Sequence, residues 1–412
     1  MTPSTRTSTT ATRTTTTRIT TSVSAPSAES GVAMFPFEDL VKAYYDCRRH
    51  KRNTASAMRF AERLEENLLD LYEELQDGSY TPGRSICFVV TRPKHREVWA
   101  ADFRDRIVHH LLYNHAGAGI EAQFIADSCA CIPGRGTLYA AERLESKVRS
   151  VTQNWSRPAH HLKLDLANFF VSIDKRVLHK QIARLIDEPW WRNLALQILW
   201  HDPRADFEVR SPRSLFNKVP QHKRLTAQAA HLGLPIGNLS SQFFANIYLN
   251  DLDQFVKHQL RAKHYIRYVD DFLLLHESPQ QLNEWLAAIE AFLPGLGARL
   301  NPSKTILQPV DRGIDFVGHV IKPWRRTTRK RTVSEAHRRV AASSDEDLRT
   351  LANSYLGLFR QATHSHKDRA AVARALLRRG FSVDAALTKT FPPRRNPCQT
   401  LASSQRCSWC CF

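Results

Sequence analysis

The apolar positions of the chain repeat with two periods, one typical of helices and one typical of strands. Leu64, Leu68, Leu71 and Leu75 fall on one helical face, and Gly78 after them predicts the end of that helix. Strands and helices in mixed order predict an α+β core, and the helical, basic pattern of the later residues predicts an all-helical unit after it. The predicted helices are 102–115, 138–148, 175–186, 191–200, 241–256, 281–292 and those within 334–379, and the predicted strands are 86–90, 162–166, 306–310, 314–317, 320–321 and a hairpin over 265–275.

Both ends of the chain lack the large apolar residues that a core requires. Residues 1–33 consist mainly of Thr, Ser, Ala and Arg, and residues 392–412 begin with Pro-Pro-Arg-Arg, so both are predicted to be disordered. A transit peptide is the alternative for the first segment, although it has no apolar helical face. The eight cysteines form no disulfide framework, and Cys407 and Cys410 have no second pair at zinc-site distance, so we expect reduced thiols without a metal.

The charge of the chain indicates a nucleic-acid partner. Its 412 residues include 59 Lys and Arg against 40 Asp and Glu, a net charge of +19. Such an excess favours polyanions, because each neutralised phosphate releases a condensed counterion. Nucleic-acid packing proteins share this charge but rarely an apolar share of 42%, so an enzyme is favoured. No apolar stretch approaches the roughly 20 residues that span a bilayer, and we expect a cytoplasmic protein without a membrane partner.

Three aspartates follow predicted strands in positions that suit divalent-metal chemistry. Asp270 and Asp271 lie between apolar β-forming residues, so a tight turn places both carboxylates at the tip of a hairpin. Cations between them would offset their repulsion, although an ordinary Asp-rich turn is the alternative. Asp165 ends another predicted strand and alone would more often cap a helix. Together the three predict a two-metal site that holds Mg²⁺, with Mn²⁺ as a substitute.

These segments resemble the palm motifs of reverse transcriptases. Leu164-Asp165-Leu166-Ala167-Asn168-Phe169-Phe170 is similar to the first palm motif, and Tyr268-Val269-Asp270-Asp271 is similar to the Tyr-x-Asp-Asp motif. The resemblance covers residues 80–322 and continues weakly to about residue 366. It implies an α+β right-hand polymerase with an antiparallel, RRM-like palm sheet between fingers and a helical thumb. The implied units are 34–160 for N-terminal helices and fingers, 161–322 for the palm and 323–391 for the basic thumb.

The resemblance also implies roles around the metal site and the nucleotide. Asp165, Asp270 and Asp271, with the backbone of Leu166, would hold the metal ions. Phe170 matches the ring that excludes a ribose 2′-hydroxyl, with a buried core residue as the alternative.

Three cations match family residues that contact phosphates. Lys94 and Arg96 correspond to the fingers cations that clamp the triphosphate, with a solvated charge run as the alternative. Lys304 corresponds to the lysine that protonates departing pyrophosphate, with an ordinary surface lysine as the alternative.

Primer and template contacts are implied for three further residues. Gly134 lies in a segment, Cys131-Ile132-Pro133-Gly134-Arg135-Gly136-Thr137, that is similar to a fingers motif. Gly318 lies in one that is similar to the primer-grip hairpin. Glycine at such positions lets nucleic acid approach the backbone. Tyr268, the first residue of the Tyr-x-Asp-Asp motif, is assigned to the same surface.

One departure from the common pattern indicates a subgroup. In most reverse transcriptases a Gln precedes the glycine that corresponds to Gly237, whereas this chain has Ile236, and the motif ends at Gln242. This pattern resembles the enzymes of diversity-generating retroelements, bacterial or phage-encoded relatives of group II intron reverse transcriptases. It implies error-prone copying opposite adenine, because apolar contact rejects misfits less well than a buried hydrogen bond. Its implied partners are an RNA template, a DNA or RNA primer, dNTPs and a small basic accessory protein.

Other functions remain open at this stage. A retron or anti-phage defence enzyme would keep the chemistry and change its use. A catalytically inactive palm would only bind RNA. An RNA-dependent RNA polymerase is less favoured, because those enzymes usually have Gly-Asp-Asp and a smaller residue at the position of Phe170. We expect no RNase H, integrase or endonuclease domain in the residues after the predicted thumb.

Overall fold

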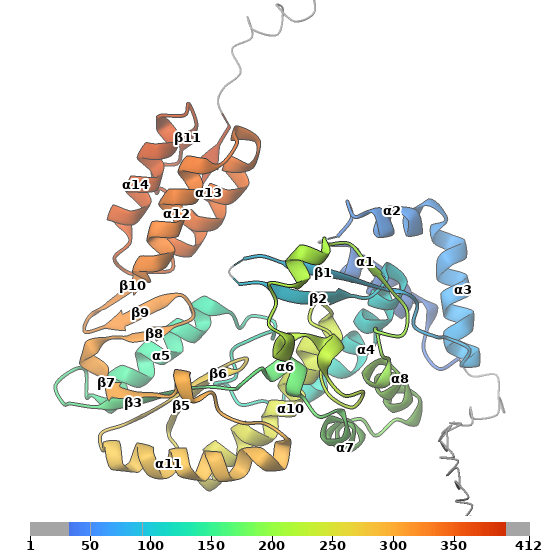
Figure 1. Ribbon diagram of the computed structural model, residues 1–412, viewed down its shortest axis with the longest axis horizontal. Coiled ribbons are helices and arrows are strands. Elements are labelled where there is room, and N and C mark those ends of the chain that lie inside the picture. The colour runs from blue at the N-terminus through green and yellow to red at the C-terminus, as the bar shows by residue number, and fades with distance from the viewer. Residues whose placement is uncertain (1–32, 50, 93, 393–412) are drawn as a thin grey trace, which may run out of the picture.

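The structure, a computed structural model, describes residues 33–49, 51–92 and 94–392 (Figure 1). Both predicted disordered ends therefore lie almost entirely outside the described residues. At the centre is an antiparallel sheet of β5 (His264–Tyr268), β6 (Asp271–His276), β3 (His160–Asp165) and β7 (Ile306–Pro309), in that spatial order. One face is covered by α5 (Thr137–Val151), and the other by α10 (Leu239–Gln254) and α11 (Pro279–Phe292).

Burial of this sheet on both faces explains its sequence. Phe272 and Leu274 of β6 pack in the core that includes α10 and α11, whereas Leu273 and Leu275 pack in a second core with α5. A strand buried on both faces is a continuous apolar run, as this one is. The two cores hold the strands firmly, so the polar residues at the strand ends have fixed positions.

A unit of helices and a small sheet lies beside the central sheet and comes from two stretches of the chain, one before β3 and one between β3 and β5. The hairpin of β1 (Ser85–Val90) and β2 (Arg96–Ala100) is joined by β4 (Phe207–Val209), which pairs in parallel with β1. Phe207 packs edge-on against Trp99 of β2, with ring centroids 4.9 Å apart. The helices that surround this sheet and connect it to the centre are α1 (Phe37–Arg48), α2 (Ala55–Glu62), α3 (Leu64–Asp77), α4 (Phe103–Glu121), α6 (Phe169–Ser172), α7 (Lys175–Leu185), α8 (Pro189–Trp200) and α9 (Arg213–Phe216).

The residues after the central sheet form a three-stranded sheet and a separate helical bundle (Figure 1). Arg326 in this three-stranded sheet is 5% exposed and pairs with Glu145 of α5 at 2.9 Å. This ion pair joins the sheet below the bundle to the helix that covers the central sheet. The bundle has its own apolar core. The strands are β8 (Ile314–Phe316), β9 (His319–Lys322) and β10 (Arg325–Thr328); the helices are α12 (Lys330–Ala342), α13 (Asp345–Phe359) and α14 (His366–Leu377), followed by the pair β11 (Ser382–Val383) and β12 (Thr390–Phe391).

The predicted elements agree with the observed ones in kind and differ mainly at their ends. Gly78 has a φ of 79° and ends α3, as its position predicts. Helix α4 continues to Glu121, beyond the predicted 102–115, and α10 runs on into a π-helix over Phe255–Gln259. Among the helices of the described residues, none is long and apolar enough to cross a membrane.

Candidate active site

Three aspartates meet at one end of the central sheet. Asp165 is the last residue of β3 and lies directly opposite Asp271, the first residue of β6, in the antiparallel register. Asp270 lies in the turn between β5 and β6, and its carbonyl accepts a hydrogen bond from the N–H of Leu166 at 3.1 Å. Strand pairing therefore brings together carboxylates that are far apart in the sequence.

Asp165 is buried, Asp270 and Asp271 are half-buried, and the three carboxylates repel one another. Asp165 is 7% exposed. Burial, and then the charge of Asp165, raise the pKa of Asp270. Burial also raises the pKa of Asp271 to about 6, against the opposing effect of the Lys163 ammonium. The negative charge of the cluster is thus only partly compensated by the protein, and a cation among the carboxylates would lower its energy.

Two lysines contact these carboxylates. Lys304 Nζ lies 2.6 Å from Asp165 Oδ2, and Lys163 Nζ lies 3.2 Å from Asp271 Oδ2. Lys163 also donates a hydrogen bond to the Asp315 carbonyl at 2.7 Å and so links the aspartates to β8. Lys163 is absent from the residues predicted for the site, although its place two residues before Asp165 on one strand face is a signal in the sequence.

The donor set suits a hard divalent cation. Carboxylate oxygens are the ligands that Mg²⁺ and Mn²⁺ prefer, and Asp271 Oδ1 is buried without a hydrogen-bond partner in the described structure. Within the same residues, no three Asp, Glu, His or Cys side chains are arranged as a ready cage for an ion. Lys304 and Lys163 lie instead against one oxygen each of Asp165 and Asp271. The chemistry of the residues fits the metal.

Phe170 lies in α6, five residues after Asp165 at the end of β3. It is half-buried, and its ring meets that of Phe169 edge-on at 5.3 Å. Phe169 is only 3% exposed and belongs to the core. The Phe170 carbonyl accepts a hydrogen bond from the N–H of Leu234 at 2.8 Å. The two protein segments that are predicted to contact the nucleotide, around Phe170 and around Ile236, are therefore neighbours.

Gly237 is required by the protein's own packing. Its φ is +129°, and a Cβ at this position would lie 2.8 Å from the carbonyl oxygen of Trp99. The preceding Ile236 accepts a hydrogen bond from the N–H of Trp99 at 2.8 Å, so this loop lies directly on β2. The structure thus gives a reason for the glycine that the sequence does not, and contact with a nucleotide stays a prediction. Gln242, also predicted for this role, is exposed in the first turn of α10.

The predicted phosphate-binding cations lie at the tip and start of β2. Arg96 is exposed as the first residue of the strand. Its charge contributes to lowering the pKa of Asp270, against the larger effects of burial and Asp165. Lys94 is exposed in the bend before the strand, and among the described contacts nothing ties it to the site.

Two of the predicted nucleic-acid contacts are glycines with open surroundings. Gly134 has a φ of +74° and Gly318 a φ of +92°, and a Cβ added at either would meet no atom within 4 Å. Tyr268 lies on β5. The centroid of its ring is 6.5 Å from that of Phe316, which belongs to the hairpin that contains Gly318. The Tyr-x-Asp-Asp hairpin and the predicted primer-grip hairpin are therefore in contact.

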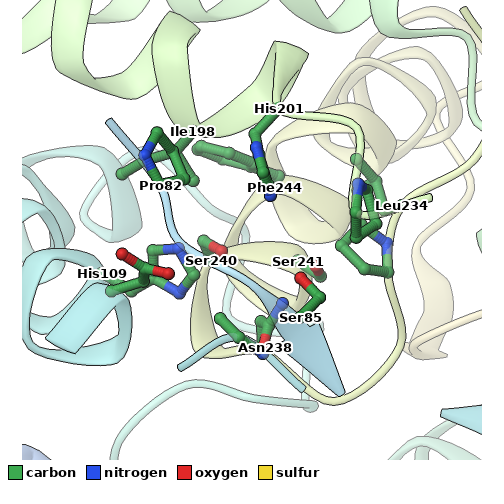
Figure 2. Close-up of a pocket in the computed structure, with 14 residues that line it drawn as sticks. Pro82, Ser85, His109, Ile198, His201, Leu234, Asn238, Ser240, Ser241 and Phe244 are labelled. Carbon is green, nitrogen blue, oxygen red and sulfur yellow. The ribbon is translucent and has the colours of Figure 1, made fainter. Parts of the chain in front are cut away.

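A small cavity behind the Gly237 loop is too small to be the substrate site. Its volume is about 20 Å³, enough for roughly one water molecule. His109 of α4 lines it together with Ser240 and Ser241 of α10 (Figure 2). His109 is 7% exposed, and its Nδ1 has no hydrogen-bond partner in the described structure. The cavity is part of the packing between α4 and α10.

The fold and the aspartate cluster define the class of this protein. A central antiparallel sheet that bears three carboxylates, with a helix-and-sheet unit beside it and a helical bundle after it, is the right-hand arrangement of palm, fingers and thumb. Residues 94–321 match the family described as reverse transcriptase (RNA-dependent DNA polymerase). The chain belongs to the reverse transcriptase family.

Comparison with other proteins adds one structural relative. The chain is similar to an apo telomerase from Candida tropicalis that was truncated from its C-terminal domain, with 12% sequence identity and a TM-score of 0.46. The similarity covers 60% of this chain, which spans 55% of that telomerase chain. No curated protein matches the chain.

Proposed function

We propose that this protein is an RNA-directed DNA polymerase whose active site consists of Asp165, Asp270 and Asp271. The observation that carries the proposal is the strand register that sets Asp165 opposite Asp271, with Asp270 in the adjoining turn. Membership of the reverse transcriptase family supports the same chemistry. The substrates would be an RNA template, a DNA or RNA primer and dNTPs.

The three carboxylates, with the backbone of Leu166, would hold two Mg²⁺ ions. When bound, such ions activate the primer 3′-hydroxyl and neutralise charge on the leaving pyrophosphate. Lys304, beside Asp165, is the residue that we assign to proton donation to pyrophosphate.

The remaining nucleotide contacts follow from position. Arg96, whose charge acts on the pKa of Asp270, and Lys94 would hold the triphosphate as charge-assisted donors. Phe170 would lie against the sugar and exclude a 2′-hydroxyl. Tyr268, Gly134 and Gly318 would contact the primer and template where the surface is open.

We further propose the diversity-generating retroelement subgroup. Ile236 replaces the polar residue common at this position, and the side chain is half-buried beside Gly237. An apolar contact in place of a hydrogen bond would weaken rejection of mispaired nucleotides. In this setting the enzyme would work with a small basic accessory protein, in mutagenic retrohoming.

The test is primer extension on an RNA template with Mg²⁺, followed by sequencing of the products. The expected result is DNA synthesis that is lost in Asp270→Ala/Asp271→Ala and kept in Asp311→Ala, which removes an exposed carboxylate. Errors concentrated opposite template adenine would support the subgroup, and Ile236→Gln should reduce them. Accurate synthesis would favour a retron or defence role. Synthesis that persists in the double variant would contradict the assigned site, and RNA binding without any synthesis would favour an inactive palm.

A further inference from the structure

The side chain of Arg267 is buried next to the turn that holds Asp270. Arg267 lies on β5, two residues before the turn, and is 1% exposed. Its Nε and Nη2 donate to the two carboxylate oxygens of Asp253 on α10, at 2.8 and 2.7 Å. This paired geometry is the strong form of an arginine–carboxylate contact. Because the side chain of Asp253 is 0% exposed, neither charge has access to solvent.

The remaining N–H groups of Arg267 are also satisfied. Nη2 donates to Ser128 Oγ at 2.8 Å, and Nη1 donates to Asn246 Oδ1 at 3.3 Å. The last donor, also on Nη1, reaches the carbonyl of Val269 at 3.1 Å. A guanidinium has five N–H donors in a fixed plane, and here each has an acceptor. The guanidinium therefore has one orientation, which is set by Asp253. Its hydrogen bond to Val269 in turn holds the backbone of the turn in place.

The carbonyl that Arg267 holds belongs to a strained residue. Val269 has a φ of +58°, a conformation that β-branched residues rarely adopt. Such a conformation persists only where surrounding contacts impose it. The peptide that follows leads into Asp270, whose own carbonyl is held by the N–H of Leu166. The turn is thus fixed on both sides, by Arg267 before Asp270 and by Leu166 at Asp270.

We propose that Arg267, oriented by Asp253, is a positioning residue that holds the Val269–Asp270 peptide so that the adjacent carboxylates can bind divalent ions. The inference rests on the proposed function, because it concerns the same carboxylates. Arg267 does not contact the nucleotide or the ions; it acts through the backbone of Val269. A merely structural role, in which the pair only joins β5 to α10, would affect folding and leave ion binding unchanged.

The test measures Mn²⁺ binding to the full chain by the loss of the free-ion electron paramagnetic resonance signal, alongside thermal unfolding and primer extension. Arg267→Lys keeps a charge beside Asp253 but cannot supply five planar donors. We expect its Mn²⁺ dissociation constant to rise about tenfold, as when a residue that supports a metal ligand is changed. We expect kcat to fall with a nearly unchanged KM for the dNTP.

Tyr265→Phe is the matched control. The Tyr265 hydroxyl donates to the same Asp253 at 2.7 Å but makes no hydrogen bond to the turn that holds Val269 and Asp270. This variant should lose stability and bind Mn²⁺ with wild-type affinity. Equal Mn²⁺ affinity in folded Arg267→Lys and Tyr265→Phe would overturn the proposal.

A second variant covers the case in which Arg267→Lys does not fold. Val269→Gly keeps the ion pair and removes the restriction on φ, so the turn is free to leave its imposed conformation. It should also weaken Mn²⁺ binding, and unchanged binding would again overturn the proposal. Mn²⁺ binding that depends on Arg267 in a protein that makes no DNA would reject the proposed function alone, because binding is measured without catalysis.

Discussion

At the scale of single residues, the proposed active site is a balance between three carboxylates and two ammonium groups. Burial raises the pKa values of Asp270 and Asp271, and Lys163 opposes that effect at Asp271. Lys304 lies against Asp165 in the same way. The protein alone stabilises such a cluster poorly, so a bound divalent cation lowers its electrostatic energy.

The ring of Phe170 should determine which nucleotide sugar the enzyme accepts. In Phe170→Val the space beside the sugar would open, and selectivity for dNTP over NTP in kcat/KM should fall about 10- to 100-fold, because the selection is steric. Single-nucleotide incorporation with each substrate measures this ratio. Phe169→Leu is the control, since Phe169 is buried in the core; it should lower the unfolding temperature and leave the ratio unchanged. A Phe170→Val enzyme with wild-type selectivity would rule out the assigned role.

At the scale of elements, the local pattern of the sequence predicts single helices and strands better than it predicts which strands pair. The hairpin at 265–275 and the helix α3 follow from spacing that lies within each segment. Strand β4 is not predicted, because three residues carry little pattern and its partner Ser85 lies in a distant segment. For the same reason, the motifs indicate Asp165 and Asp271 as site residues, whereas their direct opposition depends on the pairing of β3 with β6. The buried pair of Arg267 with Asp253 also requires two elements to meet and is not visible in either segment alone.

The loop before α10 should tolerate no side chain at Gly237. Gly237→Ala forces an unfavourable φ and a contact with the Trp99 carbonyl, so we expect a loss of about 2 kcal/mol in the free energy of unfolding. Gly134→Ala is the matched control, because Gly134 also has positive φ but open surroundings, and it should lose only about 1 kcal/mol. Urea unfolding of the two variants measures the difference. Equal losses would show that the Trp99 contact is unimportant.

At the scale of the whole molecule, the fingers helices and the palm sheet share one apolar core, whereas the thumb bundle has a core of its own. Fingers and palm meet where the Gly237 loop lies on β2, and the thumb is fixed to the palm through Arg326 and Glu145. These junctions include buried polar groups such as His109, at the cavity between α4 and α10 (Figure 2). The stability of the assembled hand should therefore depend on the protonation of such groups.

Acid should destabilise the protein through His109. Burial lowers the pKa of this residue from 6.5 to about 3, so the unfolded chain binds the proton more readily at pH values between these two limits. Stability is therefore full above about pH 6.5 and falls as the pH decreases, by about 2 kcal/mol at pH 5. His109→Gln, which does not titrate, should show a smaller loss between pH 7 and pH 5 in urea unfolding. A pH dependence identical to wild type would contradict the burial of a neutral His109.

The central claim is that Asp165 and the hairpin aspartates form one catalytic centre, and single-nucleotide incorporation on an RNA template with Mg²⁺ tests it most directly. Asp165→Asn keeps the shape of the side chain and removes its charge. We expect its single-turnover rate to fall at least about a thousandfold, since a charged metal ligand contributes several kcal/mol to transition-state stabilisation. Asp311→Asn, at an exposed position, should keep the wild-type rate. A folded Asp165→Asn protein that incorporates dNTP at the wild-type rate would contradict the account.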